Sequence, residues 1–401
     1  MRKKIVVAGS GFAGLWAALA AARAVSLAGK EQDIEITVVS PDPRLTIRPR
    51  LYEAAIDNMD PDLSALFQAV GVRHLSGRID AIRTAAHEVD IVDADGRRTL
   101  GFDKFILAAG SILNQPSVPG LTEHAFNIDQ LSSAKALEDH LKSLANLPGS
   151  AARDTVVIVG GGLTGIEAAA EMPGRLRAIL GGTAAIRVTL IEQAPSFGAD
   201  LGAAARPVIE EALAACGVET VTGTTVSSIM GDHLTTSDGR IIDTRTVVWT
   251  AGARANPLAG QISGDLDALG RVRVDAYLRA GRVSDVFVTG DQAFAASDDI
   301  GNHALMSCQH AVSLGRVAGY NAAAELLGLP LHPYSQPKYV TCVDLGSWGA
   351  LYTEGWDRQV RLTGAEAKAL KVEINTKWIY PPAPDREAVF AIANPDFVIV
   401  P

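Results

Sequence analysis

One arrangement constrains the fold of this chain more than any other feature: an apolar strand, a glycine turn and a helix follow one another twice. Residues 5–20 read IVVAGSGFAGLWAALA, and residues 156–172 read VVIVGGGLTGIEAAAEM. In each copy the pattern G-x-G-x-x-G lies between a strongly apolar run and a segment with no proline in its first two turns. This context is typical of the unit that binds a dinucleotide at the start of a parallel sheet.

The three glycines of such a turn have different physical roles. The first lets the chain turn tightly, the second lets a pyrophosphate approach the backbone, and the third lets the helix pack closely on the strand. Unpaired N–H groups at the helix N-terminus then attract the phosphates. In the two copies these glycines are Gly9, Gly11 and Gly14, and Gly160, Gly162 and Gly165.

The rest of the chain alternates short Val/Ile-rich runs with longer Ala/Leu-rich stretches, as in parallel sheets covered by helices. The dipeptides Asp95-Gly96 and Asp238-Gly239 predict hairpins in a small antiparallel insert of each half. We therefore expect an α/β fold with two Rossmann-like three-layer domains and a small C-terminal α+β unit. Its parallel strands are expected at residues 4–8, 34–39, 104–108, 155–159, 187–191, 246–250 and 286–288.

The length of the chain agrees with this division. With 401 residues, 48% of them apolar, the chain exceeds what one core can hold, because single cores stop growing near ~250–300 residues. The predicted first nucleotide domain consists of residues 1–115 and 256–329, and the second of residues 116–255. From Pro330 on, prolines and aromatic residues interrupt the pattern, so residues 330–401 are assigned to the C-terminal unit.

The residue at the end of the second strand separates the two nicotinamide cofactors, because a carboxylate there bonds a ribose and repels a 2′-phosphate. In the second unit Glu192 stands at this point with no arginine directly after it, which favours NADH over NADPH. In the first unit the residue is Ser40, with Asp42 two residues later. Serine still bonds a ribose hydroxyl, but more weakly.

Two dinucleotide sites in one chain have a joint use if one holds FAD and the other presents NADH to it. The segment VFVTGDQAF supports this, since Asp291 after a strand end could bond the ribitol chain of a flavin. A helix is expected from about His303 to Leu327, and its N-terminal dipole would stabilise negative charge on a flavin ring. Thr-Gly-Asp is also an ordinary turn, so this segment alone leaves both interpretations open.

The order VVAGSGFAG, FILAAGS, VVIVGGGLTGIE, VWTAGARANP and VFVTGDQ resembles the two-dinucleotide flavoproteins of the pyridine nucleotide-disulfide oxidoreductase superfamily. Within it the chain is most similar to the type II NADH dehydrogenases, through RPRLYEAA (48–55), VWTAGARANPL and VDLGSWG (343–349). The chain lacks the CxxC or CxxxxC pair of the disulfide reductases. The resemblance covers about residues 4–360.

This resemblance implies which residues contact the cofactors. The expected FAD site contains Gly9, Gly11, Phe12, Ala13, Gly14, Ser40, Arg48, Ala109, Gly110 and Asp291, and the expected NADH site contains Gly160, Gly162, Gly165, Glu192 and Gly252. Glu167 is implied to lie near the nicotinamide, and Glu167 and Gln309 are the candidate catalytic residues. On sequence grounds, Glu167 fits an exposed face of the first helical turn equally well.

Two departures from the family pattern weaken the assignment of a quinone as the electron acceptor. The family's quinone-facing helix carries repeated glutamines, whereas CQHAVSL keeps Gln309 and has Ser313 and Leu314 at the later positions. The family also ends in helices that lie on the bilayer. Here a short stripe interleaved with lysines and glutamates is predicted to pack on its own domain: Ala367, Leu370, Ile374 and Trp378.

The three cysteines, Cys216, Cys308 and Cys342, fit no metal-ligand spacing, so no metal site is expected. Sulfide:quinone oxidoreductases use more widely separated cysteines, and Cys308 and Cys342 both lie in segments that the resemblance places near the flavin. A redox pair and two small buried thiols stay open as alternatives. His303 and His310 flank the same region as candidate proton carriers.

The net charge of -9 and the absence of long basic runs argue against nucleic acid and anionic lipid as partners. No apolar run reaches the ~20 residues of a membrane span, and the N-terminus leads straight into a strand, which leaves no room for a signal peptide. We expect a cytoplasmic protein with at most peripheral contact with the inner face of the cell membrane. A homodimer is left open.

The sequence therefore predicts an FAD-dependent NADH oxidoreductase with FAD and NAD as cofactors. Hydride would pass from NADH to FAD, and electrons would then pass to a quinone or another small-molecule acceptor. Three alternatives stay open: a soluble NAD(P)H-dependent flavin reductase of a tailoring or detoxifying type, a sulfide:quinone oxidoreductase-like enzyme using Cys308 and Cys342, and an NADH sensor without turnover.

Overall fold

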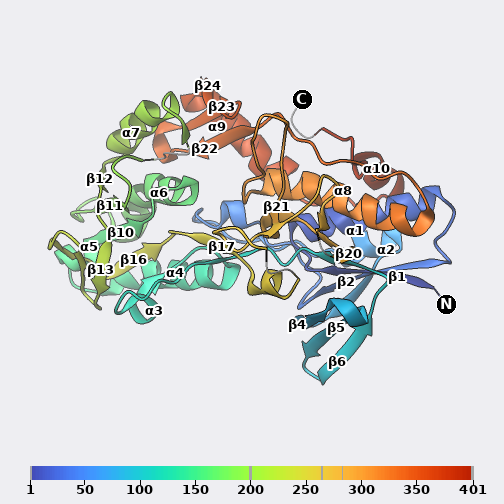
Figure 1. Cartoon of the computed structure of the whole chain (residues 1–401). Coiled ribbons are helices and arrows are strands. Elements are labelled where there is room, and N and C mark those ends of the chain that lie inside the picture. Colours follow the sequence, from blue (N-terminus) through green and yellow to red (C-terminus); the bar gives the residue numbers. More distant parts are fainter. Residues whose placement is uncertain (1, 198–200, 263–264, 282, 399–401) are drawn as a thin grey trace.

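The computed structural model describes residues 2–197, 201–262, 265–281 and 283–398. The chain forms two α/β domains with a C-terminal unit packed against both (Figure 1). Each α/β domain is built on a parallel sheet whose first strand leads into one of the two glycine turns.

The first domain has a six-stranded sheet in the order β19-β20-β7-β1-β2-β3. Neighbouring strands are parallel, except that β19 runs antiparallel to β20. The central register pairs Val6 of β1 with Thr37 of β2 and with Phe105 of β7. The strands are β1 (Lys3–Ala8), β2 (Ile34–Ser40), β3 (Arg73–Ser76), β7 (Lys104–Leu107), β19 (Arg279–Ala280) and β20 (Val283–Val288).

Alternate residues of β1 face different layers. Ile5 and Val7 pack in one core with helices α1 (Phe12–Leu27) and α8 (Cys308–Leu327), which lie together on one face of the sheet. Val6 and Ala8 pack in another core with the antiparallel sheet on the opposite face. That sheet consists of β4 (Arg78–Arg83), β5 (Glu88–Asp93) and β6 (Gly96–Gly101).

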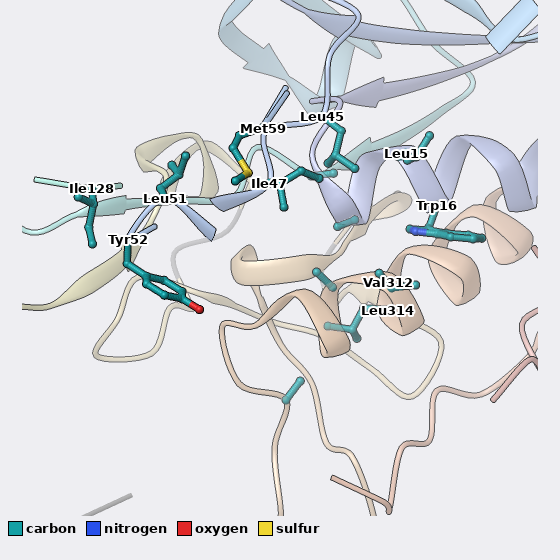
Figure 2. Close-up of a cluster of buried hydrophobic side chains, with 14 of the residues drawn as sticks. Leu15, Trp16, Leu45, Ile47, Leu51, Tyr52, Met59, Ile128, Val312 and Leu314 are labelled. Carbon is teal, nitrogen blue, oxygen red and sulfur yellow. The ribbon is translucent and has the colours of Figure 1, made fainter. Parts of the chain in front are cut away.

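Helices α1 and α8 meet along apolar side chains. Figure 2 shows Leu15 and Trp16 of α1 beside Val312 and Leu314 of α8, and all four are buried. The segment after β2 adds Leu45, Ile47, Leu51, Tyr52 and Met59 to the same core (Figure 2).

The second domain repeats these layers on a five-stranded parallel sheet in the order β12-β11-β10-β16-β9. Val156 and Ile158 of β10 face helices α6 (Leu163–Leu180) and α7 (Ala205–Cys216), whereas Val157 and Val159 face an antiparallel sheet. The strands are β9 (Ala125–Phe126), β10 (Thr155–Val159), β11 (Arg187–Glu192), β12 (Val218–Thr222) and β16 (Thr246–Trp249), with the antiparallel β13 (Val226–Ile229), β14 (His233–Thr236) and β15 (Ile241–Asp243).

The C-terminal unit connects the two domains. Its antiparallel sheet packs on α6 and α7 of the second domain, helix α9 contacts α6 through Lys368 and Lys371, and α10 packs on α1 of the first domain. A π-helical turn, Ile374–Trp378, follows α9. The unit contains β22 (Val340–Asp344), β23 (Ala350–Glu354), β24 (Gln359–Thr363), α9 (Gly364–Glu373) and α10 (Arg386–Ile392).

Further α-helices and strands, besides several short 3-10 helices, lie between these elements in the described chain. They are α2 (Ser64–Val70), α3 (Leu121–His124), α4 (Leu131–Ser143), α5 (Ala151–Asp154), β8 (Ser111–Leu113), β17 (Ala253–Ala255), β18 (Val272–Arg273) and β21 (Ala293–Phe294). β8 and β17 pair where the chain passes from one domain to the other and back, next to the predicted boundaries at 115/116 and 255/256. The boundaries themselves stay a prediction.

The predicted fold class is confirmed, with two layered α/β domains and a C-terminal antiparallel unit. Each of the seven predicted parallel strands is observed, and β10 begins and ends at the predicted residues, but three further parallel strands of the six- and five-stranded sheets, β3, β9 and β12, were not predicted. One helix boundary was wrong: α8 begins at Cys308 rather than near His303. The helix begins there because Ser307 caps its N-terminus: Ser307 Oγ accepts a hydrogen bond from the His310 N–H at 3.3 Å.

Candidate active site

The first glycine turn has room for a phosphate where the sequence predicts one. A Cβ placed on Gly11 would meet no described atom within 4 Å, whereas a Cβ on Gly14 would lie 2.0 Å from the carbonyl oxygen of Gly9. Gly11 caps α1, no described side chain caps it, and the first turn of α1 contains no acidic residue. The turn therefore combines an open approach with free N–H groups, which fits a pyrophosphate.

The second turn has the same geometry. A Cβ on Gly162 would meet no atom of the described chain within 4 Å, and one on Gly165 would lie 1.8 Å from the Gly160 carbonyl oxygen. Glu192, at the end of β11, accepts hydrogen bonds from the N–H of Gly161 at 2.6 Å and of Ala194 at 2.7 Å. Its carboxylate is thus fixed beside the turn, where a ribose is expected.

The first domain differs at the corresponding position. Ser40 is 4% exposed, and its Oγ donates to the Asp42 carbonyl at 2.6 Å and lies 2.9 Å from Nε2 of His74 on β3. Burial lowers the pKa of His74, so the imidazole is neutral near pH 7. Ser40 and His74 therefore present a neutral pair of polar groups where the second domain presents a carboxylate.

Four predicted FAD-site residues come together at the ends of β7 and β20: Arg48, Ala109, Gly110 and Asp291. Ser111 Oγ donates to Asp291 Oδ2 at 2.6 Å, and a guanidinium nitrogen of Arg48 lies 3.7 Å from the same oxygen. Arg48 also pairs with Asp129. Beside them, the Ala109 N–H donates to Gln292 at 2.6 Å, and Gly110 has a φ of +68° with no described atom within 4 Å of an added Cβ.

Other predicted residues lie close to these turns. Phe12 and Ala13 begin α1, and Ala13 packs closely on α8 at Gly315, where an added Cβ would lie 2.4 Å from the Ala13 carbonyl oxygen. Gly252 follows β16 with a φ of +79°, beside Asn114. That these residues contact FAD and NADH stays a prediction.

The first turn of α8 carries Cys308, Gln309 and His310. The side-chain Oε1 of Gln309 is buried and has no hydrogen-bond partner within the described ranges. Burial, and then the charge of Arg358, lower the pKa of His310 to about 3, and its Nδ1 lies 2.9 Å from Ser307 Oγ. His310 is therefore neutral near pH 7 and unsuited to carry a proton, while His303 stacks on Phe294 with ring centres 4.2 Å apart.

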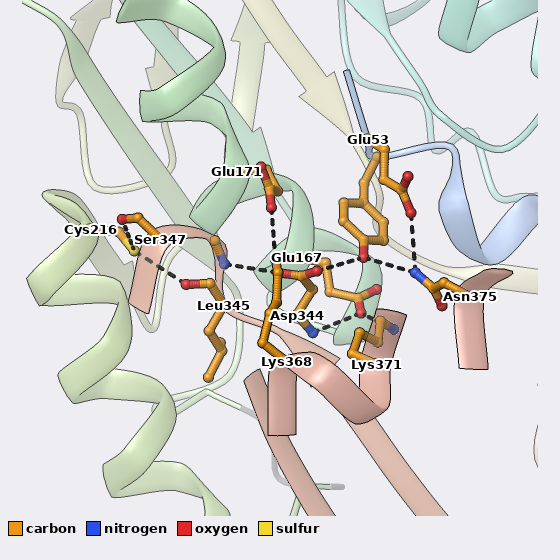
Figure 3. Close-up of polar contacts among 12 residues, drawn as sticks. Glu53, Glu167, Glu171, Cys216, Asp344, Leu345, Ser347, Lys368, Lys371 and Asn375 are labelled. Carbon is orange, nitrogen blue, oxygen red and sulfur yellow. Dashed lines mark hydrogen bonds and ion pairs between the residues drawn. The ribbon is translucent and has the colours of Figure 1, made fainter. Parts of the chain in front are cut away.

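Glu167 is buried rather than exposed. It is 7% exposed, and its Oε1 forms an ion pair with Nζ of Lys371 at 2.7 Å and accepts the Asp344 N–H at 3.0 Å (Figure 3). Burial raises the pKa of Glu167. Burial lowers the pKa of Lys371, but the Glu167 carboxylate, together with Cys342 and Asp344, raises that pKa above its ordinary value.

Sequence reasoning missed Lys371. The predicted apolar stripe was wrong in register: Trp378 is 43% exposed, whereas Lys371 and Asn375 are buried together with Ala367. The helix turns these polar residues inward because carboxylates and a tyrosine of the other domains face it. Nothing near Lys371 in the sequence signals this, because its partners come from distant segments.

Cys308 and Cys342 are free thiols, and the charge of Lys371 acts on the pKa of both. Burial raises the pKa of Cys308, and it raises that of Cys342 to about 11. Both are protonated near neutral pH, which makes them poor nucleophiles. Their use as a redox pair stays a prediction.

Among the described helices, none is both long and apolar enough to cross a membrane.

Comparison with known proteins agrees with this geometry. Residues 3–315 match the pyridine nucleotide-disulphide oxidoreductase family. An NADH dehydrogenase-like protein of Mycobacterium tuberculosis is 45% identical over 390 residues, covering 94% of each chain. A type II NADH:quinone oxidoreductase of the same species is 29% identical over 331 residues, covering 73% of this chain and 67% of that protein. The structure of NDH2 from Plasmodium falciparum in complex with NADH superposes with a TM-score of 0.78 at 13% identity, covering 98% of this chain and 97% of the other.

Proposed function

The chain belongs to the pyridine nucleotide-disulphide oxidoreductase family of FAD-dependent NAD(P)H oxidoreductases, and from this premise we propose that it is an NADH dehydrogenase that uses a quinone as electron acceptor. FAD would bind in the first domain and NADH in the second. The observation that carries the proposal is the pair of uncapped helix N-termini, each with open space over the second glycine of its turn.

Each cofactor has residues suited to hold it. The N–H groups at the start of α1 and α6 would bind the two pyrophosphates, Asp291 would bond the flavin ribitol, and Glu192 would bond the NADH ribose. FAD, when bound, supplies the hydride-accepting and electron-passing chemistry. The N-terminus of α8 would place its partial positive charge toward the flavin ring.

The buried Lys371–Glu167 pair gives the site a proton. NADH delivers a hydride, which carries two electrons and one proton, but reduction of a quinone to a quinol takes two electrons and two protons. The second proton must come from the protein or from solvent. Lys371 Nζ carries a proton at a buried position, and Glu167 Oε1 lies 2.7 Å from that nitrogen.

The acceptor is argued from two observations. The orphaned Oε1 of Gln309 is a buried acceptor suited to a quinol hydroxyl or a ring N–H. Relatives of the chain include a type II NADH:quinone oxidoreductase. Leu314, at a position where the family has glutamine, is fully buried in the core and is unavailable to an acceptor, so Gln309 would act without that partner.

An anaerobic titration tests the proposal. The purified protein is titrated with NADH while the visible flavin band is followed, and decylubiquinone is then added. Bleaching by NADH and recovery on quinone addition are expected. Bleaching without recovery would support the family chemistry but contradict the quinone acceptor, and favour the soluble flavin reductase instead. A protein purified with no flavin band and unable to bind added FAD would contradict the whole proposal.

A further inference from the structure

Polar groups from all three parts of the chain converge around Asp344, which is 5% exposed. Its Oδ2 accepts a hydrogen bond from the Tyr52 hydroxyl at 3.2 Å, and its Oδ1 pairs with Nζ of Lys368 at 2.5 Å (Figure 3). Lys368 also reaches Glu171 on α6 at 3.3 Å. Asp344 therefore joins a buried tyrosine to a lysine–glutamate pair.

One end of this chain of contacts reaches solvent, and the other ends beside the buried ion pair, where the Asp344 N–H donates to Glu167 Oε1 at 3.0 Å. The side chains of Lys368 and Glu171 are 31% and 30% exposed. Tyr52 is 2% exposed, and Lys371 Nζ lies 5.9 Å from the centre of its ring. The charge of Glu167 acts on the Tyr52 hydroxyl, whose pKa burial and the neighbouring carboxylates raise well above its usual range. Tyr52 thus stays a neutral hydroxyl that can accept one proton while it donates another.

The charges of the cluster leave room for one extra proton. Three carboxylates, Glu167, Glu171 and Asp344, face two lysines, Lys368 and Lys371. The remaining neighbours are balanced or neutral: Arg50 with Glu53, Arg175 with Glu138, and Asn375, Tyr380 and Cys342. Burial, and next the Asp344 carboxylate, raise the pKa of Glu171, so the surplus negative charge favours a bound proton.

We propose that Asp344 is the centre of a proton inlet: Glu171 and Lys368 take a proton from solvent, and Asp344 and the Tyr52 hydroxyl pass it to the Lys371–Glu167 pair. The inlet rests on the proposed function, because only a two-proton acceptor requires it. For each NADH oxidised, one proton enters from solvent and one quinone becomes a quinol, which balances the two electrons and two protons. Tyr52, Asp344, Lys368 and Glu171 are positioning and relay residues that act through Lys371.

Acceptors that differ in their need for protons test the inlet. Ferricyanide takes one electron and no proton, whereas decylubiquinone takes two electrons and two protons. Asp344→Asn is expected to slow decylubiquinone reduction by about tenfold or more and to change ferricyanide reduction by less than about twofold. Tyr52→Phe and Lys368→Met are expected to lower the same ratio of rates, and Asp344→Glu to restore part of it.

Asp154 provides a matched control. It is also 5% exposed, pairs with Arg153 at 2.6 Å and accepts a backbone N–H, but it lies in the second domain outside the cluster. Asp154→Asn is expected to lower the unfolding temperature while leaving the quinone-to-ferricyanide ratio at the wild-type value. An equal fall of that ratio in Asp154→Asn and Asp344→Asn would overturn the inlet, because the effect would then be structural.

A second readout needs no turnover. Infrared difference spectra of the protein without NADH, recorded over a pH series, are expected to show a carboxylic acid band that persists to higher pH than the bands of exposed carboxyls and that Glu171→Gln removes. A spectrum with no such band would overturn the inlet. If wild-type protein reduces neither acceptor, the proposed function fails and the inlet with it. If both acceptors are reduced and Asp344→Asn equals wild type with each, the inlet alone fails.

Discussion

Glu167 of α6 and Lys371 of α9 lie 204 positions apart in the sequence, yet their charged atoms are 2.7 Å apart and both side chains are almost fully buried. Glu167 follows directly from the glycine turn of the second domain, and Lys371 comes from the C-terminal unit. The pair therefore fixes the C-terminal unit to the helix whose first turn is expected to bind NADH.

Removing one partner of this ion pair is predicted to lower the free energy of unfolding more than removing both partners. Lys371→Met leaves Glu167 buried without a cation, which should lower the free energy of unfolding by about 3–5 kcal/mol. The double variant Glu167→Gln/Lys371→Met should recover a large part of that loss, because no unpaired charge is left. Denaturant unfolding of the wild type, both single variants and the double variant measures the coupling. Additive effects would show that the two charges do not stabilise one another.

A pH-dependent change in stability is predicted from Glu171. Its pKa is raised, first by burial and then by Asp344. A carboxyl with a higher pKa in the folded state binds more protons when folded, so its stabilising contribution is complete below the unfolded pKa of about 4.3 and is lost as the pH rises through the folded value. Glu171→Gln removes this loss. The unfolding temperature of the variant, relative to wild type, should therefore rise between about pH 4 and about pH 8.

Thermal unfolding followed by circular dichroism over that range checks this prediction. Glu373→Gln is the control, because Glu373 is 48% exposed at the end of α9 and lies outside the Asp344 cluster. The difference in unfolding temperature between Glu373→Gln and wild type should depend less on pH than the difference for Glu171→Gln. A similar slope for both variants would argue against a special environment at Glu171.

The layers of the fold were predictable because their signals are local. The buried run at β10 and the glycines after it are contiguous, so strand, turn and helix could be placed from a few residues each. The antiparallel inserts were signalled by Asp-Gly turns, which occur between β5 and β6 and between β14 and β15. Each of these features depends on residues near one another in the chain.

The polar cluster could not be predicted in this way, because its members come from distant segments. An apolar stripe through Leu370 and Trp378 was the stronger pattern in α9 and the turn after it, yet the helix buries Lys371 and Asn375. Their partners, Glu167, Tyr52 and Glu53, lie in other domains, and only the packing of those domains brings them together. Amphipathicity predicts the buried face of a helix only where the neighbouring surface is apolar.

Two glycines of α6 should respond oppositely to the same substitution. Gly165→Ala places a Cβ 1.8 Å from the Gly160 carbonyl oxygen, so the helix and the turn must move apart. The Cβ added by Gly174→Ala would have no described atom within 4 Å. Gly165→Ala should lose NADH binding and destabilise the protein by about 1–3 kcal/mol. Gly174→Ala should stabilise it by about 0.5–1 kcal/mol. Denaturant unfolding and NADH titration of both variants check this, and normal NADH binding by Gly165→Ala would contradict the role of the turn.

Glu192 is predicted to set the preference for NADH over NADPH. Its carboxylate is held beside the second glycine turn by the N–H groups of Gly161 and Ala194. Glu192→Gln keeps the size of the side chain but removes the charge that would repel a 2′-phosphate, so NADPH should bind better while NADH loses a charge-assisted hydrogen bond. Glu192→Ala should weaken the binding of NADH by about tenfold or more, since a hydrogen bond to a charged group contributes about 1.5–3 kcal/mol.

Steady-state rates with each nucleotide, at saturating acceptor, measure this preference as the ratio of the kcat/KM values for NADH and NADPH. Glu219→Ala is the control, because it removes one carboxylate from the exposed surface of the neighbouring strand β12 and should leave that ratio unchanged. An unchanged ratio in both Glu192 variants would mean that the discrimination comes from the backbone of the turn, because the carboxylate would then have no effect on the 2′ position.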